Sequence, residues 1–194
     1  MLPDRSVRMI LIGKGLRSFA DGYVAVLLPA YLLALGFNQF EVGLLGTLTL
    51  AGSALATLAI GSLGHCWPHR RLLLAAALVM AATGIAFASL TSFWPLALIA
   101  FVGTLNPSSG DVSVFMPLEQ ARLANAADGE SRTVLFSHYT VTGSLCAAIG
   151  ALASGLPVWF SSASGVVLLD AMRLMFAGYG GIGAMVWLLY RRDR

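Results

Sequence analysis

The sequence predicts an all-α membrane protein with six transmembrane helices arranged as a 3+3 inverted repeat. Three observations support this class. First, 58% of the 194 residues are hydrophobic and 11% are charged, whereas a soluble domain carries roughly 25% charged residues. Second, the apolar residues form six stretches near the length of about 20 residues that crosses a bilayer. Third, basic residues alternate between the connections. We expect one domain, 1–194, with repeat A at about 9–90 and repeat B at about 94–190.

The six predicted spans follow one another with short connections. They cover residues 9–35, 42–63, 72–90, 94 to about 118, 134–158 and 165–190. The first is closed by Gly36-Phe37-Asn38, because glycine and asparagine end helices readily. Trp94 and Trp159 fall at predicted ends, where aromatic side chains reach the membrane interface. The first span is not a cleavable signal, because charged residues interrupt it.

The basic residues predict how the chain is oriented. They lie before the first span, in the second and fourth connections and after the last span: Arg5, Arg8, Arg70, Arg71, Arg122, Arg132, Arg191, Arg192 and Arg194. The connections 36–41, 91–93 and 159–164 contain no Lys or Arg. The positive-inside rule then places both termini in the cytoplasm. We expect an integral protein of a bacterial inner membrane.

The fourth span contains an acid between helix breakers. Asp111 lies among Pro107, Gly110 and Pro117. A carboxylate in the bilayer costs about 2.5–3.5 kcal/mol, so it usually has a function, and an interrupted helix is tolerated where it lines a cavity. The pattern is typical of a transport site, although Asp111 could instead pair with a neighbouring helix for packing. Nearby polar groups could bind a ligand or cap the helix: Asn106, Ser108, Ser109 and Ser113.

The first span carries a second set of charges. Lys14, Arg17 and Asp21 are spaced three and four residues apart and share one helix face. Asp21 and Asp111 lie at a similar predicted depth, near the middle of the bilayer. Two such acids could bind and exchange protons, because desolvation favours their neutral form. Alternatively, Arg17 and Asp21 form a structural ion pair. A cation or proton-coupled substrate is favoured over a simple anion, and Lys14 and Arg17 leave an organic anion as an alternative.

Polar residues near the cytoplasmic ends of two spans have two interpretations each. His138 and Tyr139 lie about two turns into the fifth span, where His138 could relay protons or form a packing contact. Glu119 could pair with Arg122, but a solvated surface role is the favoured interpretation. Tyr139 is included in the predicted site as a neighbour of His138.

An internal similarity supports the repeat. The segment Thr-Leu-Ala-Gly-Ser-Ala-Leu-Ala, starting at Thr49, aligns with Thr-Val-Thr-Gly-Ser-Leu-Cys-Ala, starting at Thr140. Gly52 and Gly143 correspond in this alignment. Three spans separate the two segments, so the second copy must be inverted in the membrane. Chance similarity between helices rich in small residues is the alternative.

The connection between the second and third spans resembles the signature of the major facilitator superfamily, Gly-x-Leu-small-Asp-Arg/Lys-x-Gly-Arg-Arg/Lys. The chain reads Gly-Ser-Leu-Gly-His-Cys-Trp-Pro-His-Arg from Gly61 to Arg70, followed by Arg71. Gly61, Leu63 and Arg70 match. His65 stands at the position of the signature acid, and the resemblance implies that this position is part of the gate. The whole chain is similar to the N-terminal half of such a transporter. Asp170 and Arg173, one turn apart, occupy the place of the inverted copy and are expected to pair.

The resemblance implies secondary transport of a small solute by alternating access between two six-helix units. Family members usually carry twelve spans, so a half-transporter that dimerises, one half of a split transporter and a truncated chain all fit the length. The partner is a second copy or a separate chain resembling the other half. The alternative is a non-transporting subunit that scaffolds or regulates a larger membrane complex. The lipid bilayer surrounds the chain in either case.

Other functional classes lack support in the sequence. There is no basic block for nucleic acid and no nucleophile–base constellation for an enzyme. His65, Cys66 and His69 lack a fourth ligand for a structural metal. We therefore expect no metal and no cofactor.

Overall fold

The protein is helical throughout the residues that its structure describes. A computed structural model describes residues 5–63, 67–105, 113–126 and 130–192. The helices are α1 Arg5–Ala34, α2 Gln39–Leu63, α3 His69–Ser89, α4 Phe93–Val102, α5 Phe115–Ala126, α6 Glu130–Ala153, α7 Leu156–Ser164 and α8 Leu168–Arg191. Five helical stretches are long and apolar enough to cross a membrane, and α4 is a shorter apolar helix. The membrane-protein class is confirmed.

Local sequence explains where the first two helices meet. Gly36 adopts φ 95°, and the amide of Phe37 donates to the carbonyl of Leu32 at 3.2 Å, which is the pattern of a glycine-terminated helix. Asn38 then caps α2: its backbone amide donates to Glu41 Oε2 at 2.8 Å, and the amide of Glu41 donates to Asn38 Oδ1 at 2.9 Å. This reciprocal arrangement is a capping box. The predicted end of the first span at Gly36 is confirmed.

The structure interrupts the fourth span, as its helix breakers predict, and departs from the prediction at the connection between the last two spans. The predicted fourth span is divided into α4, which ends at Val102, and α5, which begins at Phe115. The predicted connection 159–164 is wrong, because these residues belong to α7. Pro157 stands in the first turn of α7, where a proline is well tolerated. Gly165 ends α7 in the left-handed conformation, with φ 71°.

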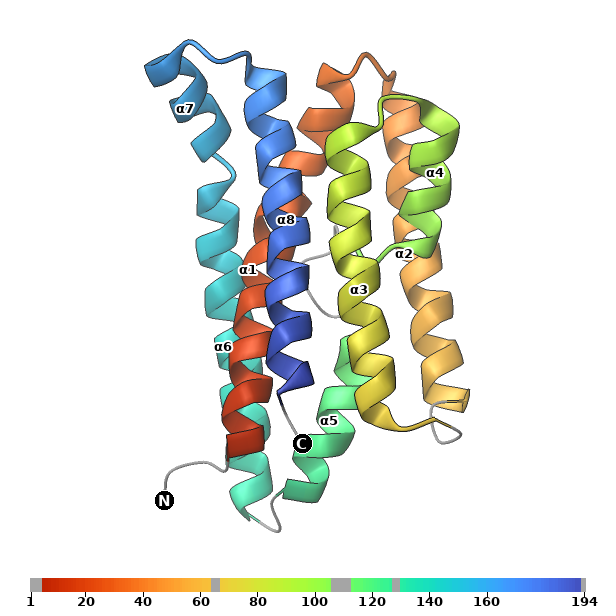
Figure 1. Cartoon of the computed structure of the whole chain (residues 1–194), viewed down its shortest axis with the longest axis vertical. Helices are drawn as coiled ribbons and strands as arrows, with labels where there is room; N and C mark the ends of the chain where they lie inside the picture. Colours follow the sequence, from red (N-terminus) through yellow and green to blue (C-terminus); the bar gives the residue numbers. More distant parts are fainter. Residues whose placement is uncertain (1–4, 64–66, 106–112, 127–129, 193–194) are drawn as a thin grey trace.

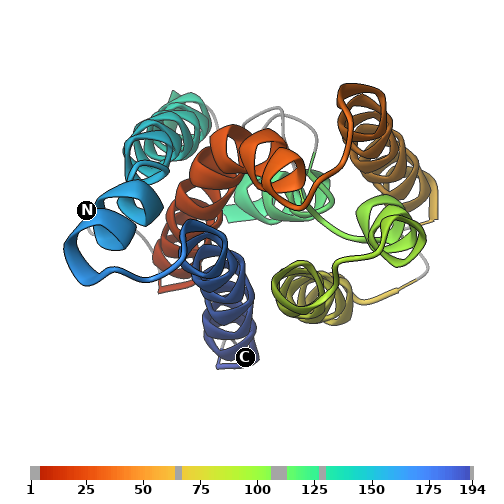
Figure 2. The ribbon, with the colours of Figure 1, turned by 90° about the horizontal axis from the view of Figure 1, so that it is seen from above.

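The helices pack in pairs that each join the two halves of the chain. α3 lies against α8, α1 against α6 and α2 against α4, and α1 also contacts α8. α1 begins and α8 ends at the same end of the bundle (Figure 1). Seen from above, α3 and α8 lie on one side, and α6 and α2 lie on the other (Figure 2).

Glycines allow these helices to approach closely. A Cβ atom on Gly22 of α1 would collide with the backbone of Ala147 in α6, and one on Gly150 of α6 would collide with the backbone of Phe19. Gly52 of α2 makes the same kind of contact with the carbonyl of Phe101 in α4. Small residues let backbones meet where lipid supplies no hydrophobic driving force between helices.

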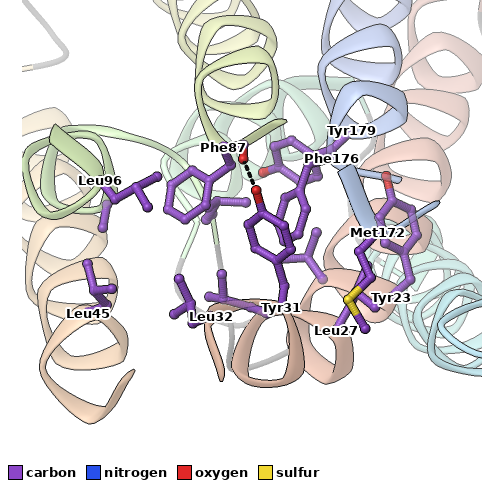
Figure 3. Close-up of a cluster of buried hydrophobic side chains, with 14 of the residues drawn as sticks. Tyr23, Leu27, Tyr31, Leu32, Leu45, Phe87, Leu96, Met172, Phe176 and Tyr179 are labelled. Carbon is purple, nitrogen blue, oxygen red and sulfur yellow. Dashed lines mark hydrogen bonds between the residues drawn. The ribbon is translucent and has the colours of Figure 1, made fainter. Parts of the chain in front are cut away.

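An aromatic cluster packs between the last turns of α1 and α3 and the first half of α8 (Figure 3). The ring of Tyr31 lies 4.6 Å from that of Phe176, and the ring of Phe176 lies 5.7 Å from that of Phe87. The Tyr31 hydroxyl donates to the carbonyl oxygen of Phe87 at 2.6 Å. That carbonyl lies in the last turn of α3, where helical carbonyls lack an intrahelical partner.

The contact at Gly52 yields a stability prediction. Gly52→Ala should destabilise the protein by about 1–3 kcal/mol, because the added methyl group collides with the α4 backbone and cannot move aside. Gly43→Ala, in the same helix, is the matched control, since a Cβ there meets nothing within 4 Å. Thermal unfolding in detergent measures both. Equal melting temperatures for the two variants would contradict the close α2–α4 packing.

Candidate functional site

A buried ion pair joins α1 to α5. Arg17 Nη2 lies 2.6 Å from Glu119 Oε2, and the two side chains are 5% and 0% exposed. The partners are 102 residues apart in the chain. A charge removed from water at this depth needs a partner and further hydrogen bonds.

Two tyrosines complete this cluster. The Tyr139 hydroxyl of α6 donates to Glu119 Oε2 at 2.7 Å, and the Tyr190 hydroxyl of α8 donates to Glu119 Oε1. Arg17 Nη1 donates to the Tyr190 oxygen at 2.9 Å. The guanidinium carbon lies 4.0 Å from the centre of the Phe115 ring. Both carboxylate oxygens therefore accept hydrogen bonds, and four helices meet at one carboxylate.

The predicted role of Glu119 is wrong. Glu119 is expected on the solvated surface, with pairing to Arg122 as the alternative, but its side chain is fully buried and pairs with Arg17. Glu119 lies in α5, the helix that follows the interruption of the fourth span, and faces Arg17 in α1. The signal was present in the sequence: Arg17, inside an apolar helix, requires a counter-charge from somewhere.

Asp21 lies on the same helix and is left out of this ion pair. Its side chain is buried, at 8% exposed. The Tyr179 hydroxyl of α8 donates to Asp21 Oδ1 at 3.4 Å and to the carbonyl oxygen of Thr104 at 3.1 Å. Thr104 follows the end of α4. Because Arg17 pairs with Glu119 instead, the structural Arg17–Asp21 ion pair proposed as an alternative does not form.

The remaining predicted site residues are dispersed. Tyr139 is buried in the ion-pair cluster, whereas His138 is exposed on the outer face of α6. Lys14 Nζ lies 5.0 Å from the centre of the Tyr139 ring. Four predicted residues lie outside the described residues and stay predictions: His65, Asn106, Ser109 and Asp111.

The residues of the signature-like connection lie at one end of the bundle. Gly61 is exposed in α2, and α2 ends at Leu63. Arg70 Nη2 donates to the carbonyl oxygen of Arg191 at 2.7 Å, which ties α3 to the end of α8. Arg71 is exposed.

The predicted pairing of Asp170 and Arg173 is present. Arg173 Nη1 lies 3.0 Å from Asp170 Oδ1. The Arg173 side chain is 33% exposed and the Asp170 side chain is 55% exposed. Within the described ranges, no three His, Cys, Asp or Glu side chains gather as a metal site would require.

Comparison with known proteins identifies the family to which this helical arrangement belongs. The sequence profile of the Major Facilitator Superfamily matches residues 10–194. The chain therefore belongs to the Major Facilitator Superfamily, whose members are generally membrane transporters. It is 25% identical over 178 residues to an uncharacterized membrane protein of Saccharomyces cerevisiae, YJR124C. The match covers 91% of this chain and 40% of the yeast protein.

The burial of the Arg17–Glu119 ion pair predicts that removing one of its charges strongly lowers the stability of the protein. Glu119→Gln should destabilise the protein by about 3–5 kcal/mol, because it leaves Arg17 charged and buried without its partner. Combining Glu119→Gln with Arg17→Gln should cost less than the sum of the two single variants, since both charges disappear together. Thermal unfolding in detergent measures the cycle.

The exposed Asp170–Arg173 pair provides the control. Asp170→Asn should cost no more than about 1 kcal/mol, as solvent-accessible pairs usually do. If Glu119→Gln were as mild as Asp170→Asn, the Arg17–Glu119 pair would not hold the helices together.

Proposed function

We propose that the protein is a secondary transporter that moves a small solute by alternating access, with Asp21 binding a proton or a cationic group. The observation that carries this proposal is the environment of Asp21. It is a buried carboxylate in α1, beside the end of the interrupted fourth span, and its charge is not matched by the neighbouring Arg17. Intramembrane acids without a structural partner mark ion or substrate pathways. Asp111, the sequence-predicted partner, remains part of the proposal.

The helix pairing supports a 3+3 inverted repeat. In such a repeat α1 corresponds to α4 and α5, α2 corresponds to α6, and α3 corresponds to α8. A contact between α1 and α6 then requires an equivalent contact between α2 and α4, and α3 pairs with its own counterpart α8. All three pairs are in contact. The aligned glycines behave alike, because Gly52 meets α4 while Gly143 meets Lys14 and Ser18 of α1. A repeat of this kind places transport sites at the interface between its copies.

The two sides of the bundle differ in a way that supports a second six-helix unit. The outer faces of α3 and α8 expose apolar side chains: Leu78, Ile85, Leu174, Met185 and Leu188. The outer face of α6 exposes a line of hydroxyl groups spaced three and four residues apart: Thr133, Ser137, Thr140 and Ser144. The apolar side chains of α3 and α8 suit lipid. α6 also exposes apolar side chains, among them Val141, Leu145 and Ile149, but it adds a line of small polar residues, which is typical of helix contacts in membranes.

A second copy of the chain is the proposed occupant of the α6 and α2 side. The yeast relative is long enough to hold a further unit of this size, since the match covers 40% of its length. A two-fold dimer would create the same pairing of units from identical chains. The arginine-rich connections support a cytoplasmic location for both termini.

A non-transporting subunit is the second candidate function. The cluster around Glu119 favours it, because every charged group there is satisfied within one unit. A scaffold needs only the hydrogen-bonded cluster around Glu119. A transporter also needs Asp21 to bind and release a proton or a cation. Measurements on Asp21 therefore separate the two functions.

Proteoliposomes loaded with a pH-sensitive dye test the role of Asp21. Addition of solutes from a panel of small sugars, amines and carboxylates should cause proton movement in the wild-type protein. Asp21→Asn should reduce this coupled movement at least tenfold, because the amide cannot carry a proton or an ion pair. Asp170→Asn should retain it. Coupled movement unchanged in Asp21→Asn would remove Asp21 from transport.

Cysteine cross-linking tests the second unit. Single cysteines at Thr133, Ser137, Thr140 and Ser144, introduced after replacing Cys66 and Cys146 with alanine, should yield covalent dimers under mild oxidation in native membranes. Ile85→Cys on α3 is the control, because its side chain is exposed on the side assigned to lipid. Cross-linking that is no stronger from α6 than from Ile85 would contradict this interface.

A further inference from the structure

We infer that Asp21, Thr104 and Tyr179 form a binding site for a small monovalent cation of the Na⁺ class. This inference rests on the proposed function and names the occupant of the Asp21 site. It begins with a buried carboxylate that accepts a long hydrogen bond and with a buried hydroxyl that has no partner among the described residues.

Asp21 is a poorly satisfied carboxylate. Its hydrogen bond in the described part of the chain comes from Tyr179 at 3.4 Å, which is longer than the usual range for an O–H donor. A buried carboxylate normally accepts several short hydrogen bonds or pairs with a cation. Glu119, by contrast, has several close partners within the protein: Arg17 at 2.6 Å and the hydroxyl groups of two tyrosines.

The Thr104 hydroxyl is the second unsatisfied oxygen. Its Oγ1 atom is buried and has no hydrogen-bond partner among the described residues. The carbonyl of the same residue accepts the hydrogen bond from Tyr179 at 3.1 Å. Thr104 and Asp21 are thus held on either side of one tyrosine hydroxyl. An unsatisfied buried polar atom in a native protein calls for an explanation, and an ion or a water molecule is the usual one.

The end of α4 adds negative partial charge at this place. α4 ends at Val102, and Gly103 continues in an extended conformation, with φ −72° and ψ 177°. Carbonyl groups in the last turn of a helix lack intrahelical partners and carry part of the negative end of the helix dipole. Interrupted membrane helices in transporters use such carbonyl ends to bind cations.

The set of donor atoms indicates the class of ligand. A carboxylate, a hydroxyl and backbone carbonyls are hard oxygen ligands. One carboxylate balances a single positive charge, whereas calcium sites in proteins usually gather several acidic side chains. A bound proton would satisfy Asp21 but would leave the Thr104 hydroxyl without a partner. A cation of one charge offers a partner to both groups, which the Tyr179 hydroxyl already links through its contacts with Asp21 Oδ1 and the Thr104 carbonyl.

The two positive side chains that lie near Asp21 on α1 also make contacts with other residues. Arg17, one turn away on α1, pairs with Glu119. Lys14, two turns away, lies over the Tyr139 ring. Tyr23 directs its hydroxyl to the carbonyl oxygen of Met175 at 3.2 Å. The remaining neighbour, Tyr179, contributes a hydroxyl group and no charge.

Thermal unfolding of the purified full chain in detergent at pH 8 tests the site. Sodium chloride should raise the melting temperature above that in choline chloride at equal ionic strength, in a saturable manner. Asp21→Asn and Thr104→Val should each weaken the apparent Na⁺ affinity at least tenfold. Thr49→Val is the matched control: Thr49 is buried, and its hydroxyl already donates to the carbonyl of Gly46 at 2.6 Å.

Two results would overturn the site. One is a wild-type melting temperature that is the same in sodium and choline chloride; a water molecule or a proton would then be the occupant. The other is a Na⁺ response in Thr104→Val as strong as in Thr49→Val. Tyr179→Phe, expected to weaken Na⁺ binding less than Thr104→Val, supplies a second variant if Asp21→Asn does not fold.

The same measurement separates this site from the transport proposal. Na⁺ stabilisation that is retained without any solute-driven flux would support the site and remove the transporter. Solute-driven proton flux that depends on Asp21 without any Na⁺ stabilisation would retain the transporter and remove the cation site.

Discussion

The buried pair between Arg17 and Glu119 is the interaction on which the rest of the structure depends. Removing two charges from water costs several kcal/mol for each ion, and only close pairing with further hydrogen bonds offsets that cost. The pair is 2.6 Å long and receives hydroxyl groups from Tyr139 and Tyr190. It therefore connects α5, which follows the interruption of the fourth span, to α1, α6 and α8. It also occupies Arg17, so that Asp21 must find a counter-charge elsewhere.

The two acids near the centre of the bundle consequently have opposite characters. Glu119 is satisfied by a side chain from each of three other helices, and this arrangement is what a structural residue requires. Asp21 receives one long hydrogen bond from Tyr179 beside the open end of α4. A carboxylate that the fold leaves incomplete is available to exchange ligands, and the transport and cation-binding proposals both rest on this difference. The rigid cluster and the incomplete site are only one helical turn apart on α1.

Most of the helices could be predicted from the sequence, and the site could be predicted only in part. The end of the first helix at Gly36 and the pairing of Asp170 with Arg173 depend on residues within a few positions of each other, so spacing rules suffice. Residues 159–164 are predicted as a connection but belong to α7, because a nine-residue helix that begins next to Pro157 has no periodicity long enough to recognise. Glu119 was misplaced because its partner is 102 residues away.

By itself the sequence determined that the chain is a bundle of apolar helices with acids inside two of them. The physical reason is that a bilayer offers no hydrogen bonds to the backbone, so long apolar segments must become helices. Only the tertiary structure decided which charges meet. Hydropathy does not encode the approach of α5 to α1, because that approach arises from the helix break, from glycine contacts such as Gly52 against α4, and from tyrosines on two other helices. The pairing of Arg17 with Glu119, and the exclusion of Asp21 from it, follow from that packing.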